Sequence, residues 1–223
     1  PLQIDDVELL FAAMPQQLAH IDSSNYRPDL DGVSQMDVFA PGETAQGYIL
    51  SDTVQAQMTF TRFWGPSIGA TQLTTLVEVG GININDMPDE SELRLNGPGT
   101  ARNGGIAGKE GLAIALQNGV ETNPFPDEFA WGYRFVAKLD YTNVFAGINM
   151  TPKFIFSHDV SGITPDPIFL FVEDRKSISA GVTFDYQSRW SADVTYNSFW
   201  GGVGTTNKME DRDYVSFNIK YSL

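Results

Sequence analysis

The sequence predicts an all-β protein with antiparallel strands, and three observations support this fold class. Apolar and polar residues alternate along several long stretches, which is the two-residue period of a strand with one apolar face. The connections between these stretches are alternately short and long. Aromatic residues make up 12% of the chain, and no apolar run approaches the roughly 20 residues that a membrane-spanning helix needs.

The strands are expected in two groups within one domain over residues 1–223. A hairpin is predicted over 54–80 with its turn at 65–70, and five further strands over 129–223. Short turns are expected at Thr142-Asn143 and at Gln187-Ser188. We therefore predict seven strands.

The other segments are predicted to be long connections. Apolar residues at helical spacing predict a short helix over Asp5–Leu18 in the first of them, and another over Lys109–Gln117 in the longest. The long connections are expected at 1–53, 81–128, 159–174 and 201–211.

The alternation of connection lengths favours an outer-membrane β-barrel over a soluble β-sandwich. Such barrels keep periplasmic turns short and let extracellular loops grow, and their strands alternate between lipid-facing and lumen-facing side chains. Strands in soluble proteins are usually about 5–6 residues long, shorter than those predicted here. The pattern predicts a bacterial outer-membrane location, with residues 1–53 and 81–128 as extracellular loops and the carboxyl terminus in the periplasm.

Seven strands ending in the periplasm predict an incomplete barrel. Bacterial single-chain barrels have even strand numbers, and an open edge in lipid leaves backbone groups unpaired. We expect residues 54–64 and 212–223 to pair with missing N-terminal strands or with another chain. The chain starts at Pro1 without a signal-peptide pattern, which we interpret as a mature or partial chain whose export signal lies upstream.

Charged residues on the polar parity of the strands are the candidate functional residues. They are interpreted either as a charged constriction that selects solutes by sign, or as ion pairs that fill a plugged barrel. The lumen-facing candidates are Arg134, Lys138, Asp140, Lys153, Arg175, Asp185, Arg189 and Asp193, with Lys220 on the last strand.

The last strand carries a candidate assembly signal, because its apolar residues alternate up to the carboxyl terminus. Lipid and lipopolysaccharide are expected to surround such a strand. The residues of this signal are Val215, Phe217, Ile219, Tyr221 and Leu223.

The sequence predicts no catalytic residue and no cofactor. Ser157-His158-Asp159 is the only run that suggests a hydrolase, and no serine shares the face expected for His158. The chain has no cysteine, and its net charge of −14 argues against a nucleic-acid partner. No metal site is predicted, although an acidic loop could bridge to lipopolysaccharide through a divalent cation. The acidic residues of this loop are Asp86, Asp89, Glu90 and Glu92.

Five stretches of the chain carry a resemblance to a known family: PLQIDDVELL, SELRLNGPGT, FAWGYRFVAKLDYTNVFAGINMTPKFIFSHDVSG, FVEDRKSISAGVTFDYQSRWSADVTYNSFWGG and DRDYVSFNIKYS. In them the chain resembles the C-terminal portion of the proteobacterial outer-membrane proteins catalogued as domain of unknown function 1302. Where this chain ends in Leu223, the family usually ends in Phe. The resemblance implies a role in the envelope, with an export system as a partner and hydrophobic or lipid-like compounds as cargo.

Three functions therefore follow as expectations. A channel or transport partner for a hydrophobic or lipid-like solute is favoured. A surface receptor or structural envelope protein with a plugged lumen is the alternative, and an outer-membrane lipid hydrolase is the least favoured.

Overall fold

A computed structural model describes the strands and most of their connections. The described residues are 1–4, 8–9, 12, 36, 39–97, 125–202, 207 and 209–222. The helix predicted over Lys109–Gln117 lies outside them, as does Leu223. Of the helix predicted over Asp5–Leu18, only Glu8, Leu9 and Ala12 are described, and all three have helical backbone.

Seven strands form one antiparallel sheet, in which each strand pairs with its neighbours in the sequence. β3 and β9 are the two edges and do not pair with each other, so the sheet is not closed. The strands are β3 (Thr53–Ser67), β4 (Ala70–Ile84), β5 (Phe129–Phe145), β6 (Ile148–Ser161), β7 (Lys176–Tyr186), β8 (Trp190–Trp200) and β9 (Tyr214–Tyr221). The prediction of an antiparallel all-β fold is confirmed.

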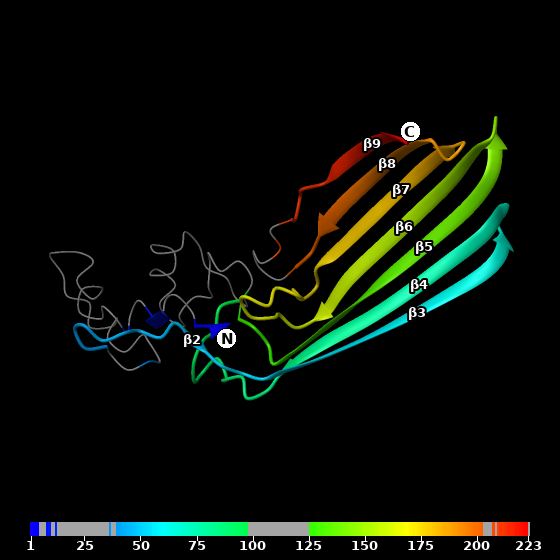
Figure 1. Cartoon of the computed structure of the whole chain (residues 1–223). Helices are drawn as coiled ribbons and strands as arrows, with labels where there is room; N and C mark the ends of the chain where they lie inside the picture. Colours follow the sequence, from blue (N-terminus) through cyan, green and yellow to red (C-terminus); the bar gives the residue numbers. More distant parts are fainter. Residues whose placement is uncertain are drawn as a thin grey trace.

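The short turns lie at one end of the sheet and the long connections at the other (Figure 1). Each short turn has two successive residues with positive φ, at Ile68-Gly69, Ala146-Gly147 and Gln187-Ser188. Such turns match the twist of antiparallel hairpins. No helix among the described residues is long and apolar enough to cross a membrane.

The turn predicted at Thr142-Asn143 is wrong, because β5 continues to Phe145. The register shifts between Tyr141 and Phe145, and Asn143 itself has positive φ. The Asn143 side chain accepts a hydrogen bond from Gly147 N at 3.0 Å. Thr142-Asn143 thus marks an irregularity within β5. The chain reverses direction at Ala146-Gly147, where glycine allows positive φ.

The two faces of the sheet differ in chemistry. Directly opposed partners share a face, and one row of partners is Phe60, Val77, Phe135, Phe156 and Ile178. The next row on the other face is Thr59, Glu78, Arg134, Ser157 and Ser177. We call these the apolar face and the polar face.

Large side chains on the apolar face are exposed. Aromatic rings contact one another along it, for example Trp190 and Tyr221 with ring centroids 4.6 Å apart. Exposed members include Val54, Met58, Phe60, Val77, Val79, Phe129, Phe154, Trp190, Val194, Tyr196, Trp200, Val215, Phe217, Ile219 and Tyr221.

A small core lies beside the long connections. β1 (Leu2–Gln3) pairs with β2 (Tyr48–Ile49), and Ile4 forms a bridge with Leu95. The buried residues of this core are Leu2, Ile4, Ile84 and Leu95. Residues 1–53 are therefore not simply one loop, since their first residues pair with β2 and with the connection after β4.

Candidate functional site

The polar face carries the charged residues predicted from strand parity, but it does not gather them in one place. Register puts those that lie within strands on the same face. Arg175 precedes β7, and Arg189 lies in the turn between β7 and β8. Those within strands are Arg134, Lys138 and Asp140 on β5, Lys153 on β6, Asp185 on β7, Asp193 on β8 and Lys220 on β9.

Lys138, Asp140 and Lys153 lie closer to the short-turn end. Lys138 Nζ is 3.1 Å from Asp140 Oδ1, and Lys138 is directly opposite Lys153. Thr151 Oγ1 donates to Asp140 Oδ1 at 3.3 Å. These charges form a local group on β5 and β6.

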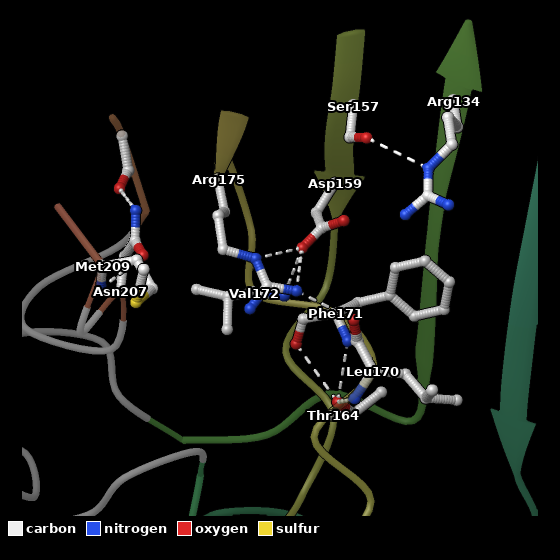
Figure 2. A network of polar contacts seen from close by, with 11 residues as sticks. Arg134, Ser157, Asp159, Thr164, Leu170, Phe171, Val172, Arg175, Asn207 and Met209 are labelled. Atoms are coloured by element: carbon white, nitrogen blue, oxygen red, sulfur yellow. Dashed lines mark hydrogen bonds and ion pairs between the residues drawn. The ribbon is translucent and has the colours of Figure 1, made fainter. Parts of the chain in front are cut away.

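Arg134 and Arg175 are the two predicted residues that line a hollow of about 410 Å³ on the polar face. Arg134 Nε donates to Ser157 Oγ at 3.3 Å. The hollow lies at the long-connection end, where the connection between β6 and β7 folds over the sheet (Figure 2). We call residues 162–175 the β6–β7 loop.

The β6–β7 loop is held in shape by Thr164, whose side chain is fully buried. Its hydroxyl oxygen accepts hydrogen bonds from Leu170 N at 2.9 Å and Phe171 N at 3.0 Å. Phe171 O in turn accepts from Thr164 N at 3.0 Å. These bonds close the loop on itself and fix the position of Phe171.

Phe171 lies over two glycines of the polar face. Gly80 and Gly132 are directly opposed on β4 and β5. A Cβ at Gly132 would lie 3.1 Å from Phe171 Cε1, and a Cβ at Gly80 would lie 4.0 Å from Phe171 Cζ. The missing side chains leave the space that the ring occupies, as aromatic side chains often cover glycines in sheets.

An ion pair fastens the far end of the loop to β6. Asp159 Oδ2 accepts from Arg175 Nε at 2.7 Å and from Val172 N at 3.1 Å, and Arg175 Nη2 is 2.6 Å from the same oxygen. Arg175 Nη2 also donates to Leu170 O at 2.9 Å. Figure 2 shows the contacts of Arg175 and Val172 converging on Asp159. Arg175 therefore has a structural role as well as a place in the hollow lining.

Carboxylates also hold the ends of the long connections. Ile163 N donates to Asp127 Oδ2 at 2.8 Å. Burial raises the pKa of Asp127, the hydrogen bond from Ile163 opposes this, and the nearby Glu173 charge raises the pKa further. A hydrogen bond from Lys176 is the largest cause that lowers the pKa of Asp174.

At the start of β9, Asp213 performs the same role. It accepts hydrogen bonds from Tyr196 Oη at 2.7 Å, Phe199 N at 3.0 Å and Ser198 Oγ at 2.9 Å. These bonds hold the pKa of Asp213 below its ordinary value, with the tyrosine contributing most. The carboxylate thus ties the chain entering β9 to the end of β8.

The family model described as "Protein of unknown function (DUF1302)" matches residues 1–223. The chain belongs to the DUF1302 family. No curated protein and no solved structure matches it.

In this DUF1302 protein the side chains of Ser157, His158 and Asp159 each contact different partners. Ser157 accepts the bond from Arg134, and Asp159 binds Arg175. His158 is on the apolar face, where its ring contacts Tyr133 with centroids 5.5 Å apart. Its Nε2 lies 3.8 Å from Asp174 Oδ1. The three side chains do not form a hydrogen-bonded triad.

The candidate assembly residues of β9 lie on the apolar face. Val215, Phe217, Ile219 and Tyr221 are directly opposite Tyr196, Val194, Ala192 and Trp190. Leu223 lies outside the described residues. Within the part of the chain that the structure describes, no three acidic or histidine side chains, those of the 86–92 loop included, are grouped to hold a metal ion.

The β6–β7 loop and Phe171 are the functional features that strand parity missed. The sequence predicts residues 159–174 only as a long connection. Their signal in the sequence is weak. Gly80 and Gly132 occupy polar-parity positions within strands, as Gly181 also does, and glycine within a strand often marks close approach of another group.

Proposed function

We propose that this DUF1302 protein supplies seven membrane-spanning strands of an outer-membrane β-barrel that acts as a channel or transport partner for a hydrophobic or lipid-like solute. In this proposal the polar face lines the lumen and the apolar face contacts lipid. The observation that carries the proposal is the exposed apolar face on one side of a sheet whose other side is polar.

Strand length supports a transmembrane arrangement. A tilted strand needs about 9–11 residues to cross a bilayer. β3 and β4 each have 15 residues, β5 has 17, and β7 and β8 have 11. β9 has 8 residues and is the shortest of the seven.

Exposure of large apolar side chains supports contact with lipid. Met58 is 75% exposed, Phe60 65% and Phe217 64%. Monomeric soluble proteins rarely expose contiguous apolar patches larger than about 300–600 Å². Lipid would satisfy this face, while the polar face would remain hydrated in the lumen.

The unpaired edges support completion by further strands. β3 and β9 each have one neighbour in the sheet. In lipid, each backbone N–H or C=O group left without a hydrogen bond at an open edge costs roughly several kcal/mol. We therefore propose that other strands, from the same protein or from another chain, pair with both edges. The resemblance adds an envelope export system as a proposed partner.

A plugged receptor or structural protein is the second candidate, and the β6–β7 loop is the observation that favours it. The loop lies over the polar face, with Phe171 above Gly80 and Gly132. A loop in this place narrows any lumen that the polar face lines. A lipid hydrolase has less support, because Ser157 and His158 lie on opposite faces.

Conductance in planar lipid bilayers tests the two candidates. A channel predicts current steps for the wild type, larger steps for Phe171→Ala, and an altered preference between anions and cations for Arg134→Ala. Phe169→Ala is the matched control, because Phe169 belongs to the same loop but does not line the hollow. Absence of current in the wild type and in Phe171→Ala would contradict the channel and support the plugged alternative.

A further inference from the structure

We propose that the hollow beneath the β6–β7 loop is a binding site for an amphipathic anion, with Arg134 as the residue that binds its carboxylate or other anionic group. The inference rests on the proposed function, because the hollow lies on the face proposed to line the lumen. It assigns a solute class and a specificity-determining residue to that face.

The hollow has the size and mixed lining of a small-molecule site. Its volume of about 410 Å³ falls within the roughly 300–1,000 Å³ of ligand pockets. Leu170, Phe171, Phe199 and Met209 supply apolar surface, and Leu170 and Met209 are each about two-fifths exposed. An apolar group of matching size can therefore lie against these side chains without displacing a strand.

Arg134 provides the positive group. Its Nε is engaged by Ser157 at 3.3 Å, and no ion pair to Arg134 occurs among the described residues. The side chain is exposed, and Figure 2 shows its guanidinium directed toward the side of the hollow that holds the Phe171 ring. A guanidinium with free N–H groups can bind a carboxylate with two parallel hydrogen bonds.

The other cations among the described residues that line the hollow are already paired. Arg175 is paired with Asp159, and Lys176 contacts Asp174. Glu78 is directly opposite Arg134 but accepts a bond from Thr59 Oγ1 at 3.4 Å. Among the described lining residues, an incoming anion therefore meets an available guanidinium at Arg134 and a repelling carboxylate at Glu78.

The site favours an anion over a cation for a geometric reason. Glu78 and Asp159 are the two carboxylates among the described residues that line the hollow, and Asp159 already binds Arg175 and Val172 N. Within the described part of the lining, a cation would have only Glu78 to bind, beside the positive charge of Arg134. An amphipathic anion instead places its charge at Arg134 and its apolar part against Phe171.

Binding of three matched compounds tests the proposal. Phenylbutyrate, phenylbutanol and phenylbutylamine share a carbon skeleton and differ in charge. Their affinities are measured by titration calorimetry with the protein, in its complete barrel, in zwitterionic lipid nanodiscs, with empty nanodiscs subtracted. We expect phenylbutyrate to bind about tenfold more tightly than the amine, since a hydrogen bond to a charged group is typically worth this much.

Substitutions in the hollow test whether the preference for phenylbutyrate arises at Arg134. Arg134→Gln is expected to weaken phenylbutyrate binding roughly tenfold and leave phenylbutanol unchanged. Glu78→Gln is expected to strengthen phenylbutyrate binding, because it removes the repelling charge. Lys153→Gln is the control, since Lys153 lies on the same face but outside the hollow. Heat-modifiable migration in gels checks that each variant is folded.

Equal affinity for the anion and the amine, or unchanged phenylbutyrate affinity in Arg134→Gln, would overturn the proposal. Added phosphatidylglycerol that competes with phenylbutyrate would identify a membrane lipid as the source of the anion, and no competition would identify a dissolved solute. Binding without conductance would refute the channel and retain the site. Conductance without phenylbutyrate binding would refute the site and retain the channel.

Discussion

Substitution of Gly132 tests how closely β5 packs against β6 and against Phe171 of the β6–β7 loop. In Gly132→Ala the new Cβ would lie 2.7 Å from His158 O, 3.0 Å from Asp159 Cα and 3.1 Å from Phe171 Cε1. Two of these contacts are with backbone, which cannot rotate away. Either β6 or the loop must therefore move.

The matched control is Gly80→Ala, on the neighbouring strand and beneath the same ring. Its Cβ would meet Ala56 O at 3.7 Å and Phe171 Cζ at 4.0 Å, which are ordinary contact distances. Overpacking of a well-packed region typically costs about 1–3 kcal/mol. We expect Gly132→Ala to lower the free energy of unfolding by this amount, and Gly80→Ala to leave it nearly unchanged.

The assay is urea unfolding of the protein folded in lipid vesicles, followed by tryptophan fluorescence. The two midpoints are compared at equal slope, so that their difference reports stability alone. Adding Phe171→Leu to Gly132→Ala should restore only part of the loss, because the contact with His158 O remains. Equal midpoints for the two alanine variants would refute the described packing of β5 against β6.

Three further predictions concern the ion pair, the buried carboxylate and the two faces. Asp159→Asn should weaken the ion pair with Arg175 and lower the free energy of unfolding by about 1–3 kcal/mol. The β6–β7 loop should then become more susceptible to limited proteolysis, and unchanged cleavage would contradict the role of this ion pair in fastening the loop to β6. Asp127 has a raised pKa in the folded state, so its contribution to stability is full below the ordinary value of 3.8 and is lost as pH rises through the folded value. As pH rises toward neutrality, the urea midpoint of the wild type should therefore fall relative to that of Asp127→Asn. A difference between the two midpoints that does not change with pH would argue against this ionisation. Phe217→Arg should cost about 2–4 kcal/mol in lipid if it lies near the bilayer centre, whereas Ser216→Arg on the polar face should cost much less; equal losses of urea stability would contradict the assignment of faces.

The strands could be predicted from the sequence because their signal is local. In β5 the odd residues from Phe129 to Tyr141 are aromatic or aliphatic, and the even ones are small or charged except for Val136. The alternation itself therefore identifies the strand and its faces. The turn lies at Ala146-Gly147, whereas the sequence predicts it at Thr142-Asn143, because that pair has turn-like composition. A bulge that keeps a strand going cannot be distinguished from a turn by composition alone.

The site could be predicted only in part, because its contacts join distant segments. Parity placed Arg134 on the polar face, but it also placed Lys153 and Asp185 there, and nothing in their pattern indicates which of them lines a hollow. Phe171 reaches Gly80 and Gly132 only after β4 and β5 have paired in register. The ion pair of Asp159 with Arg175 similarly depends on how the loop folds back.

The central proposal is that this sheet crosses a membrane with one face in lipid and the other in water. The most direct test measures how accessible each residue along β8 is to lipid-soluble and water-soluble reagents. The chain has no cysteine, so single cysteines can be placed at Ala192, Asp193, Val194 and Thr195 and spin-labelled in lipid vesicles. If the apolar face contacts lipid, labels at Ala192 and Val194 should collide with lipid-soluble oxygen, and labels at Asp193 and Thr195 with a water-soluble nickel complex. Equal access of the nickel complex to all four positions would contradict it.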